Sequence, residues 1–94
     1  MHVMIRSYSG QGASNLFDAL ATRQDEVKSL MGSVPGFISY SAFRADGGGH
    51  TITACRDKAG TEESSRRAAE WIRDNLDVRV DPPAISEGST VVNF

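Results

Sequence analysis

The sequence predicts an α+β domain in which four strands and two helices follow one another as strand, helix, strand, strand, helix, strand. Residues 2–9 and 84–93, near the two ends of the chain, are rich in residues that favour strands. Two segments with apolar residues at helical spacing lie between them, and a glycine-rich turn separates two further strands. We expect a single domain over residues 1–94.

The first predicted strand, residues 2–9, carries two kinds of side chain at alternating positions. Val3 and Ile5 are apolar, whereas Arg6 and Tyr8 belong to a mixed set. Successive side chains of a strand point to opposite faces of its sheet. We therefore expect Val3 and Ile5 on the face that the helices cover and Arg6 and Tyr8 on the other face.

The first predicted helix follows the glycines at positions 10 and 12, where Ser14 or Asn15 is placed to cap it. Its apolar side chains recur on one helical face: Leu16, Leu20, Val27, Leu30 and Met31. Gly32 is a typical helix end, and Pro35 prevents the helix from continuing.

The next two predicted strands, residues 37–44 and 51–56, form a hairpin around Gly47, Gly48 and Gly49. A phosphate-binding glycine loop is the alternative, but such a loop opens a helix and often carries a lysine, and this one joins two strands and has none. If Ala45 pairs with His50, an apolar face suited to the helices is separated from a mixed face. The mixed face then consists of Ile38, Tyr40, Ala42, Arg44, Thr51, Thr53 and Cys55, joined by Arg6 and Tyr8.

The second predicted helix begins at Thr61 and has an apolar stripe flanked by Trp71. Its arginines are within helical reach of acidic residues, so a paired, solvated face is favoured over an anion site. A connector over residues 77–83 contains two prolines and leads to the last strand, 84–93, in which Gly88 indicates a bulge or a bend.

Composition excludes several classes of function. The chain has 10 basic and 12 acidic residues and a net charge of −2, which gives no general attraction to nucleic acid or to anionic membranes. One cysteine excludes an internal disulfide, and no apolar run approaches the roughly 20 residues of a membrane span. No secretory signal is recognisable. We expect a cytoplasmic protein.

The predicted order corresponds to the ferredoxin-like plan, a four-stranded antiparallel sheet with both helices on one face. Within it, the chain resembles the antibiotic biosynthesis monooxygenase superfamily of dimeric α/β barrels. The resemblance extends over nearly the whole chain and rests on the glycine-rich hairpin and on residues 34–40 (Val34-Pro35-Gly36-Phe37-Ile38-Ser39-Tyr40), 51–57, 61–65 and 68–72. It implies a homodimer in which the open sheet faces meet and each subunit holds one pocket.

The resemblance leaves the activity open. Haem-degrading members use an Asn on the first strand, a Trp near the end of the third and a His on the second helix. This chain has Arg6 or Ser7, Cys55, and Ser64 or Ser65 there, which argues against haem degradation. We expect a protein that binds a small aromatic or anionic molecule in a pocket between sheet and helices. The alternative is a cofactor-independent monooxygenase that acts on a phenolic or quinone-type substrate.

The candidate pocket residues are polar side chains on the mixed face: Arg6, Tyr8, Tyr40, Thr53 and Cys55. An arginine among apolar strand residues needs an anionic partner or solvent, and an internal ion pair with Glu87 or an aspartate is favoured over a ligand carboxylate. A small core or pocket thiol is favoured over a nucleophile for Cys55.

Two histidines and one cysteine, far apart in the sequence, offer no spacing for metal ligands, and we expect neither a metal nor a cofactor. An RNA-recognition domain has the same element order, but it needs aromatic residues on its third strand, where this chain has none. An amino-acid-sensing domain shares the plan too, but usually accompanies a larger enzyme.

Overall fold

The computed structural model describes residues 1–94 and has the predicted elements in the predicted order, with the first helical region in two parts. The strands are β1 (His2–Ser9), β2 (Phe37–Ala45), β3 (Gly48–Cys55) and β4 (Ala84–Ser89). The helices are α1 (Ala13–Thr22), α2 (Gln24–Gly32) and α3 (Lys58–Asn75). Arg23 separates α1 from α2 because its φ of −119° and ψ of 39° are not helical.

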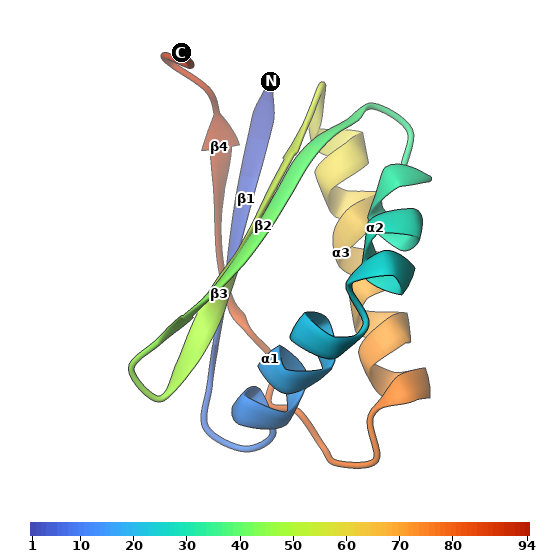
Figure 1. The fold of residues 1–94 in the computed structure, drawn as a ribbon. Coiled ribbons are helices and arrows are strands. Elements are labelled where there is room, and N and C mark those ends of the chain that lie inside the picture. The colour runs from blue at the N-terminus through green and yellow to red at the C-terminus, as the bar shows by residue number, and fades with distance from the viewer.

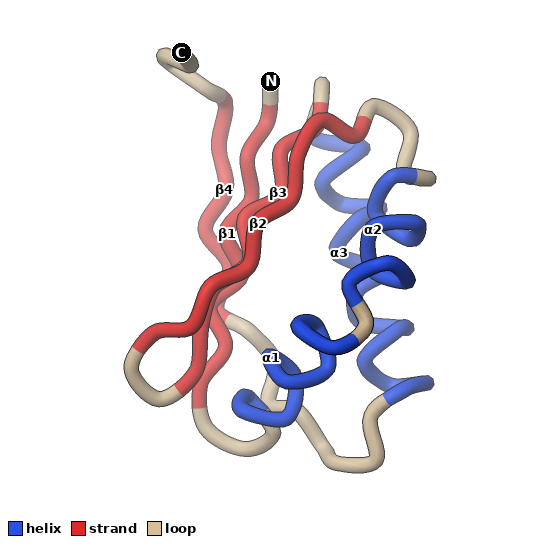
Figure 2. Tube along the Cα trace, in the orientation of Figure 1, coloured by secondary structure: helices blue, strands red, loops and turns tan.

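The four strands form one antiparallel sheet in the order β2-β3-β1-β4. All three helices lie on one face of this sheet, and the other face carries no helix (Figure 1). Figure 2 shows the same two layers, with the strands in red and the helices in blue. This arrangement confirms the predicted ferredoxin-like fold. None of the helices is both long enough and apolar enough to cross a membrane.

The two faces of the sheet are the reverse of those predicted from β1. Met4, Arg6 and Tyr8 are buried beneath the helices, whereas Val3 and Ile5 lie on the open face. The alternation was a weak guide because both sets contain apolar residues, so neither set is identified by hydrophobicity alone. The mixed face is therefore the inner face of this fold.

The hairpin between β2 and β3 differs from the predicted one by two residues. Ala45 pairs with Gly48 rather than with His50, so Phe43 lies opposite His50. Asp46 and Gly47 form the connection, and Gly47 adopts a φ of 73°, which favours glycine. A shift of two residues preserves the alternation, so the strand residues assigned to one face stay together, except Ile38. The prediction for Ile38 is wrong, because Phe37 pairs with Cys55 and packs against the core in its place, and Ile38 is 47% exposed.

The predicted bulge at Gly88 is wrong, and a bulge occurs in β2 instead. The pairing of β1 with β4 runs without interruption from His2 opposite Ser89 to Ser7 opposite Ala84. The irregularity lies between Phe37 and Ser39, and β4 ends at Ser89, short of the predicted end at residue 93. A bulge at an edge strand bends it and limits pairing with other chains.

Both long helical regions begin earlier than predicted. The backbone of Gly12, with a φ of 79°, precedes α1, and neither Ser14 nor Asn15 caps it. For α3 the cap is Asp57 rather than Thr61, because the Asp57 carboxylate accepts a hydrogen bond of 3.1 Å from the Gly60 N–H. The Thr61 hydroxyl instead donates to the carbonyl of Lys58 within the first turn.

The core between the two layers is built largely from the apolar faces predicted for the helices. Its buried members are Tyr8, Ala13, Leu16, Phe17, Val27, Met31, Ala68 and Trp71. The break at Arg23 is held against α3, since its guanidinium lies 5.1 Å from the centre of the Trp71 ring. The Trp71 indole N–H donates to the Glu26 carboxylate at 2.8 Å.

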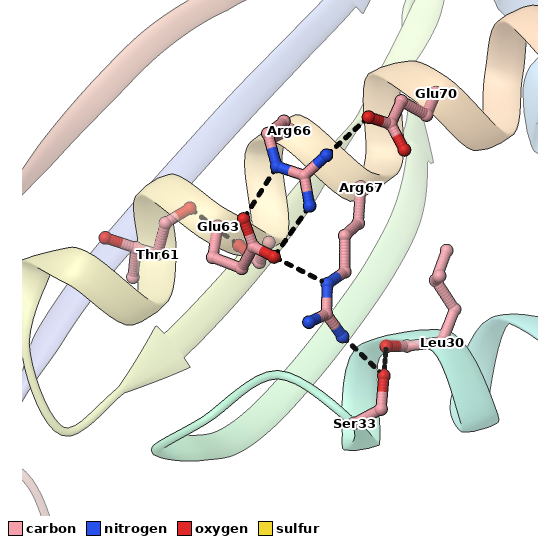
Figure 3. A network of polar contacts seen from close by, with 8 residues as sticks. Leu30, Ser33, Thr61, Glu63, Arg66, Arg67 and Glu70 are labelled. Atoms are coloured by element: carbon pink, nitrogen blue, oxygen red, sulfur yellow. Dashed lines mark hydrogen bonds and ion pairs between the residues drawn. The ribbon is translucent and has the colours of Figure 1, made fainter.

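The outer face of α3 carries the paired charges that the sequence predicted. Glu63 accepts hydrogen bonds from Arg66 and Arg67, and Arg66 also pairs with Glu70 (Figure 3). Arg67 reaches across to the hydroxyl of Ser33, just after α2, at 2.5 Å. These contacts connect α3 to the end of α2 on the side of the helix layer away from the sheet.

Candidate functional site

Arg6 is the most unusual residue of the interior. It lies on β1 beneath the helices and is 1% exposed. Its Nε donates to the Thr51 hydroxyl at 3.1 Å, and its Nη2 donates to the Thr53 hydroxyl at 2.9 Å. Thr51 pairs with Arg6 across β1 and β3, and Thr53, two residues further along, points to the same face. The neighbouring strand therefore holds one edge of the guanidinium.

No carboxylate neutralises this buried charge. Arg6 has no acidic partner within 4.0 Å, and Glu87, its expected partner, pairs with His2 at 3.0 Å instead. The predicted internal ion pair is therefore wrong, because Glu87 lies opposite Met4 and reaches along the sheet edge to His2. The Arg6 Nη1 atom is buried and makes no hydrogen bond. An unpaired buried ion costs several kcal/mol of folding free energy.

The direction of the free nitrogen follows from the planarity of the guanidinium. The Nε and Nη2 atoms form the edge that faces Thr51 and Thr53 on β3. The bond from Cζ to Nη1 points away from that edge. Nη1 is therefore directed away from the two threonines of β3.

Two tyrosines accompany Arg6: Tyr8 lies two residues further along β1, and Tyr40 lies on β2, beyond β3. Burial raises the pKa of Tyr40 to about 12, and the nearby charge of Arg6 only partly opposes this. Burial also raises the pKa of Tyr8, again against the influence of Arg6. Both phenols are therefore neutral at physiological pH and serve as hydrogen-bond donors or acceptors, not as bases.

The three residues line a small cavity between the sheet and the helices. This central cavity has a volume of about 20 Å³, with Arg6, Tyr8, Tyr40 and Thr51 as its polar lining and apolar side chains from the helices around them. Its volume is close to that needed by one water molecule. A larger molecule must therefore occupy one of the grooves that adjoin it.

Two grooves share residues with the central cavity. The α2–β2 groove, about 790 Å³, lies between α1, α2 and the edge strand β2 and shares Tyr40 with the cavity. The α3–β4 groove, about 500 Å³, lies between α3, the connector that follows it and β4, and shares Arg6 and Tyr8. Both volumes are in the range of small-molecule sites.

The structure brings together most of the residues singled out in the sequence. Arg6, Tyr8 and Tyr40 line the central cavity, and Thr53 holds Arg6. Cys55 lies apart from them, fully buried against the start of α3, where a Cβ on Gly60 would be 2.7 Å from the Cys55 Cβ. Burial raises the pKa of the Cys55 thiol, and Asp57 adds to this effect, so the thiol is unreactive.

Sequence reasoning missed three residues of this region as site candidates. Thr51 shares the face of Thr53, and its position two residues away was a usable signal. Arg73 and Arg79 line the α3–β4 groove, but Arg73 reads as a member of a solvated helix face. Arg79 lies in a connector without periodicity, so no local pattern predicts what it faces.

Comparison with known proteins supports the fold and no specific activity. No family model matches the chain, and no curated protein matches it. The structure is similar to the crystal structure of NE2512, a protein of unknown function from Nitrosomonas europaea, with a TM-score of 0.67 and 17% identity. The match covers 99% of this chain and 90% of that one. At this identity the likeness is one of fold.

Proposed function

We propose that this protein binds a small anionic molecule with an apolar or aromatic body between the sheet and the helices. The observation that carries the proposal is Arg6, a buried guanidinium with a free Nη1 and no carboxylate partner. Buried charges in proteins are normally paired, and those at functional sites are paired by the ligand. A carboxylate, phosphate or phenolate that reaches Nη1 supplies the missing partner.

The surroundings of Arg6 fit such a ligand. The neutral phenols of Tyr8 and Tyr40 donate hydrogen bonds without adding charge, and the apolar walls of the adjoining α3–β4 groove accept a ring or an alkyl group. Thr51 and Thr53 hold the guanidinium in one orientation, so its free nitrogen needs no rearrangement on binding. Low local dielectric strengthens the resulting ion pair.

Thermal unfolding with benzoate, and with benzyl alcohol as the neutral analogue, tests this proposal. Benzoate at 100 times its dissociation constant is expected to stabilise the protein by about 2.7 kcal/mol, and benzyl alcohol by much less. Arg6→Gln, which keeps a polar side chain but removes the charge, is expected to abolish the difference. Equal shifts with both compounds in the wild-type protein would overturn the proposal, whether or not the variant folds.

We also propose that the chain is a homodimer of the antibiotic biosynthesis monooxygenase-like α/β-barrel type, joined through the open sheet face. Apolar side chains on that face support this, among them Val3, Ile5 and Ile52, together with Phe43, which is 49% exposed. The C-terminal residues Val91, Val92 and Phe94 are also exposed and apolar. Exposed apolar surface of this kind is typical of an interface.

Sedimentation at several concentrations measures the oligomeric state. Ile52→Glu introduces a charge in the middle of the open face, and Val78→Glu introduces the same charge on the connector outside it. The wild-type protein and Val78→Glu are expected to sediment as dimers, and Ile52→Glu as a monomer. A monomeric wild-type protein, or a dimer that tolerates Ile52→Glu, contradicts the proposed interface.

A second candidate function is oxygenation of a phenol without a cofactor. It is favoured by the same cluster, since Arg6 stabilises a phenolate, the electron-rich form that reacts with O₂. The balanced reaction converts a phenol and O₂ into a quinone and water, with all electrons from the substrate. Oxygen uptake with 1-naphthol, above the rate in buffer and lost in Arg6→Gln, is the expected result. Binding of 1-naphthol without oxygen uptake assigns the site to binding alone.

A further inference from the structure

We infer that the ligand of this site is a dianion that enters through the α3–β4 groove, with one acidic group on Arg6 and a second near Arg79 at the mouth. This inference rests on the proposed function and adds the side of entry and the class of ligand. The geometry of three arginines in one groove carries it.

The direction of Arg6 selects between the two grooves. Its bonded edge faces β3, so its free Nη1 points away from β3, the strand that lies between Arg6 and the α2–β2 groove. The α3–β4 groove is lined by both Arg6 and Ile85, the residue of β4 that pairs with Arg6. The α2–β2 groove on the opposite side does not include Arg6. An anion on Nη1 therefore reaches solvent through the α3–β4 groove.

The charges of this groove favour a second acidic group on the ligand. Arg73 and Arg79 line the groove with Arg6, against one acidic residue, Asp81. Asp81 is partly satisfied, because its carboxylate accepts a hydrogen bond of 3.2 Å from the Gln11 N–H. Arg73 lies 3.3 Å from Asp74 on the exposed face of α3, whereas Arg79 has no carboxylate within 4.0 Å. Arg79 is thus the free cation at the mouth.

The walls between the two charged points are apolar. The groove is lined by Ile72 from α3, Leu76 directly after it, Val78 and Val80 from the connector, and Ile85 from β4. A ligand with a hydrophobic body and an acidic group at each end matches this arrangement, in which Arg6 lies at the inner end of the groove, Arg79 at the outer end and apolar side chains between them. Isophthalate, an aromatic ring with two carboxylates, is a simple probe of that pattern, and its monomethyl ester is the matched monoanion.

Isothermal titration with these two probes tests the inference. The wild-type protein is expected to bind isophthalate about two- to fivefold more tightly than the monoester, the range of one exposed ion pair. Arg79→Gln should remove this preference, and added salt should weaken it. Arg56→Gln is the matched control, because Arg56 is exposed, has no ion pair and lies outside the groove. It should leave both affinities unchanged.

The outcomes separate this inference from the proposed function. If the wild-type protein binds both probes equally, the dianion is wrong while the binding site stands. If the preference survives in Arg79→Gln, the second acidic group does not lie at Arg79, and the inferred path through the α3–β4 groove is wrong. Loss of the preference in Lys28→Gln, on the α2–β2 groove, places the entrance on the other side and also overturns the inference. If the wild-type protein binds neither probe, the proposed function fails as well.

Discussion

Tyr40 gives a quantitative test of how dry the centre of the site is. Burial raises the pKa of its phenol from the ordinary 10.0 to about 12 in the folded protein. When the protein unfolds, the phenol recovers the ordinary value. A folded-state pKa above the unfolded one means that stability is unaffected below pH 10 and is lost as pH rises toward 12.

The difference between the two pKa values corresponds to roughly 2.7 kcal/mol over the full range. About half of it, ~1.4 kcal/mol, is lost by pH 11, and almost nothing is lost at pH 9. Tyr40→Phe removes this titration. At pH 9 the variant differs from the wild-type protein only by the loss of the hydroxyl contact with Thr51, on the order of 1 kcal/mol.

Urea unfolding of the wild-type protein and Tyr40→Phe at pH 9 and at pH 11 measures the effect. Because the other groups titrate in both proteins, the change in their stability difference isolates Tyr40. From pH 9 to pH 11, we expect the free energy of unfolding of Tyr40→Phe to rise by about 1.4 kcal/mol relative to that of the wild-type protein. An unchanged difference would refute the dry environment of the cavity around Tyr40.

Two further predictions concern the frame around the site. Gly36 has a φ of 79°, so Gly36→Val is expected to lower the free energy of unfolding, measured in urea, by about 1–2 kcal/mol. Gly32→Ala is the control, because Gly32 lies in a helix with free space around it, and it should not lower this free energy. Similar urea midpoints for the two variants would contradict the need for a positive φ at Gly36. Hydrogen bonds from Arg66 and then Arg67 lower the pKa of Glu63 from 4.5 to about 2. Glu63→Gln should therefore be less stable than the wild-type protein above pH 4.5, and the gap should close as pH falls toward 2. A difference in stability that is constant with pH would show that the charge of Glu63 does not stabilise the folded protein.

The element order could be predicted from the sequence because each boundary has a local cause. Pro35 and Gly36 between α2 and β2, and Asp46 and Gly47 in the hairpin, restrict the backbone at those positions. The grouping of strand residues by face was also predictable apart from Ile38, since alternation survives a register error of two but not the bulge between Phe37 and Ser39. The break at Arg23 was not, because it depends on contacts with Trp71 and Asn75, which lie far along the chain.

The orientation of the sheet and the partner of Arg6 could not be predicted, and both errors have the same origin. Apolar residues such as Val3 and Ile5 lie on the open face, so hydrophobicity did not identify the inner face. The sequence identified Arg6 as a cation that needs an anionic partner or solvent, but it offered acidic residues without their positions in space. Only the register shows that Glu87 lies with Met4 and His2, and that threonines hold Arg6 instead.

Native mass spectrometry with isophthalate is the measurement that tests the central claim most directly, because it reports the oligomer and the bound anion together. The wild-type protein is expected to appear as a dimer of the 10.1 kDa chain with one isophthalate per subunit, and Arg6→Gln as a dimer without it. Equal occupancy in the two proteins would contradict the assignment of Arg6 as the anion's partner, since the anion would then bind without the buried guanidinium.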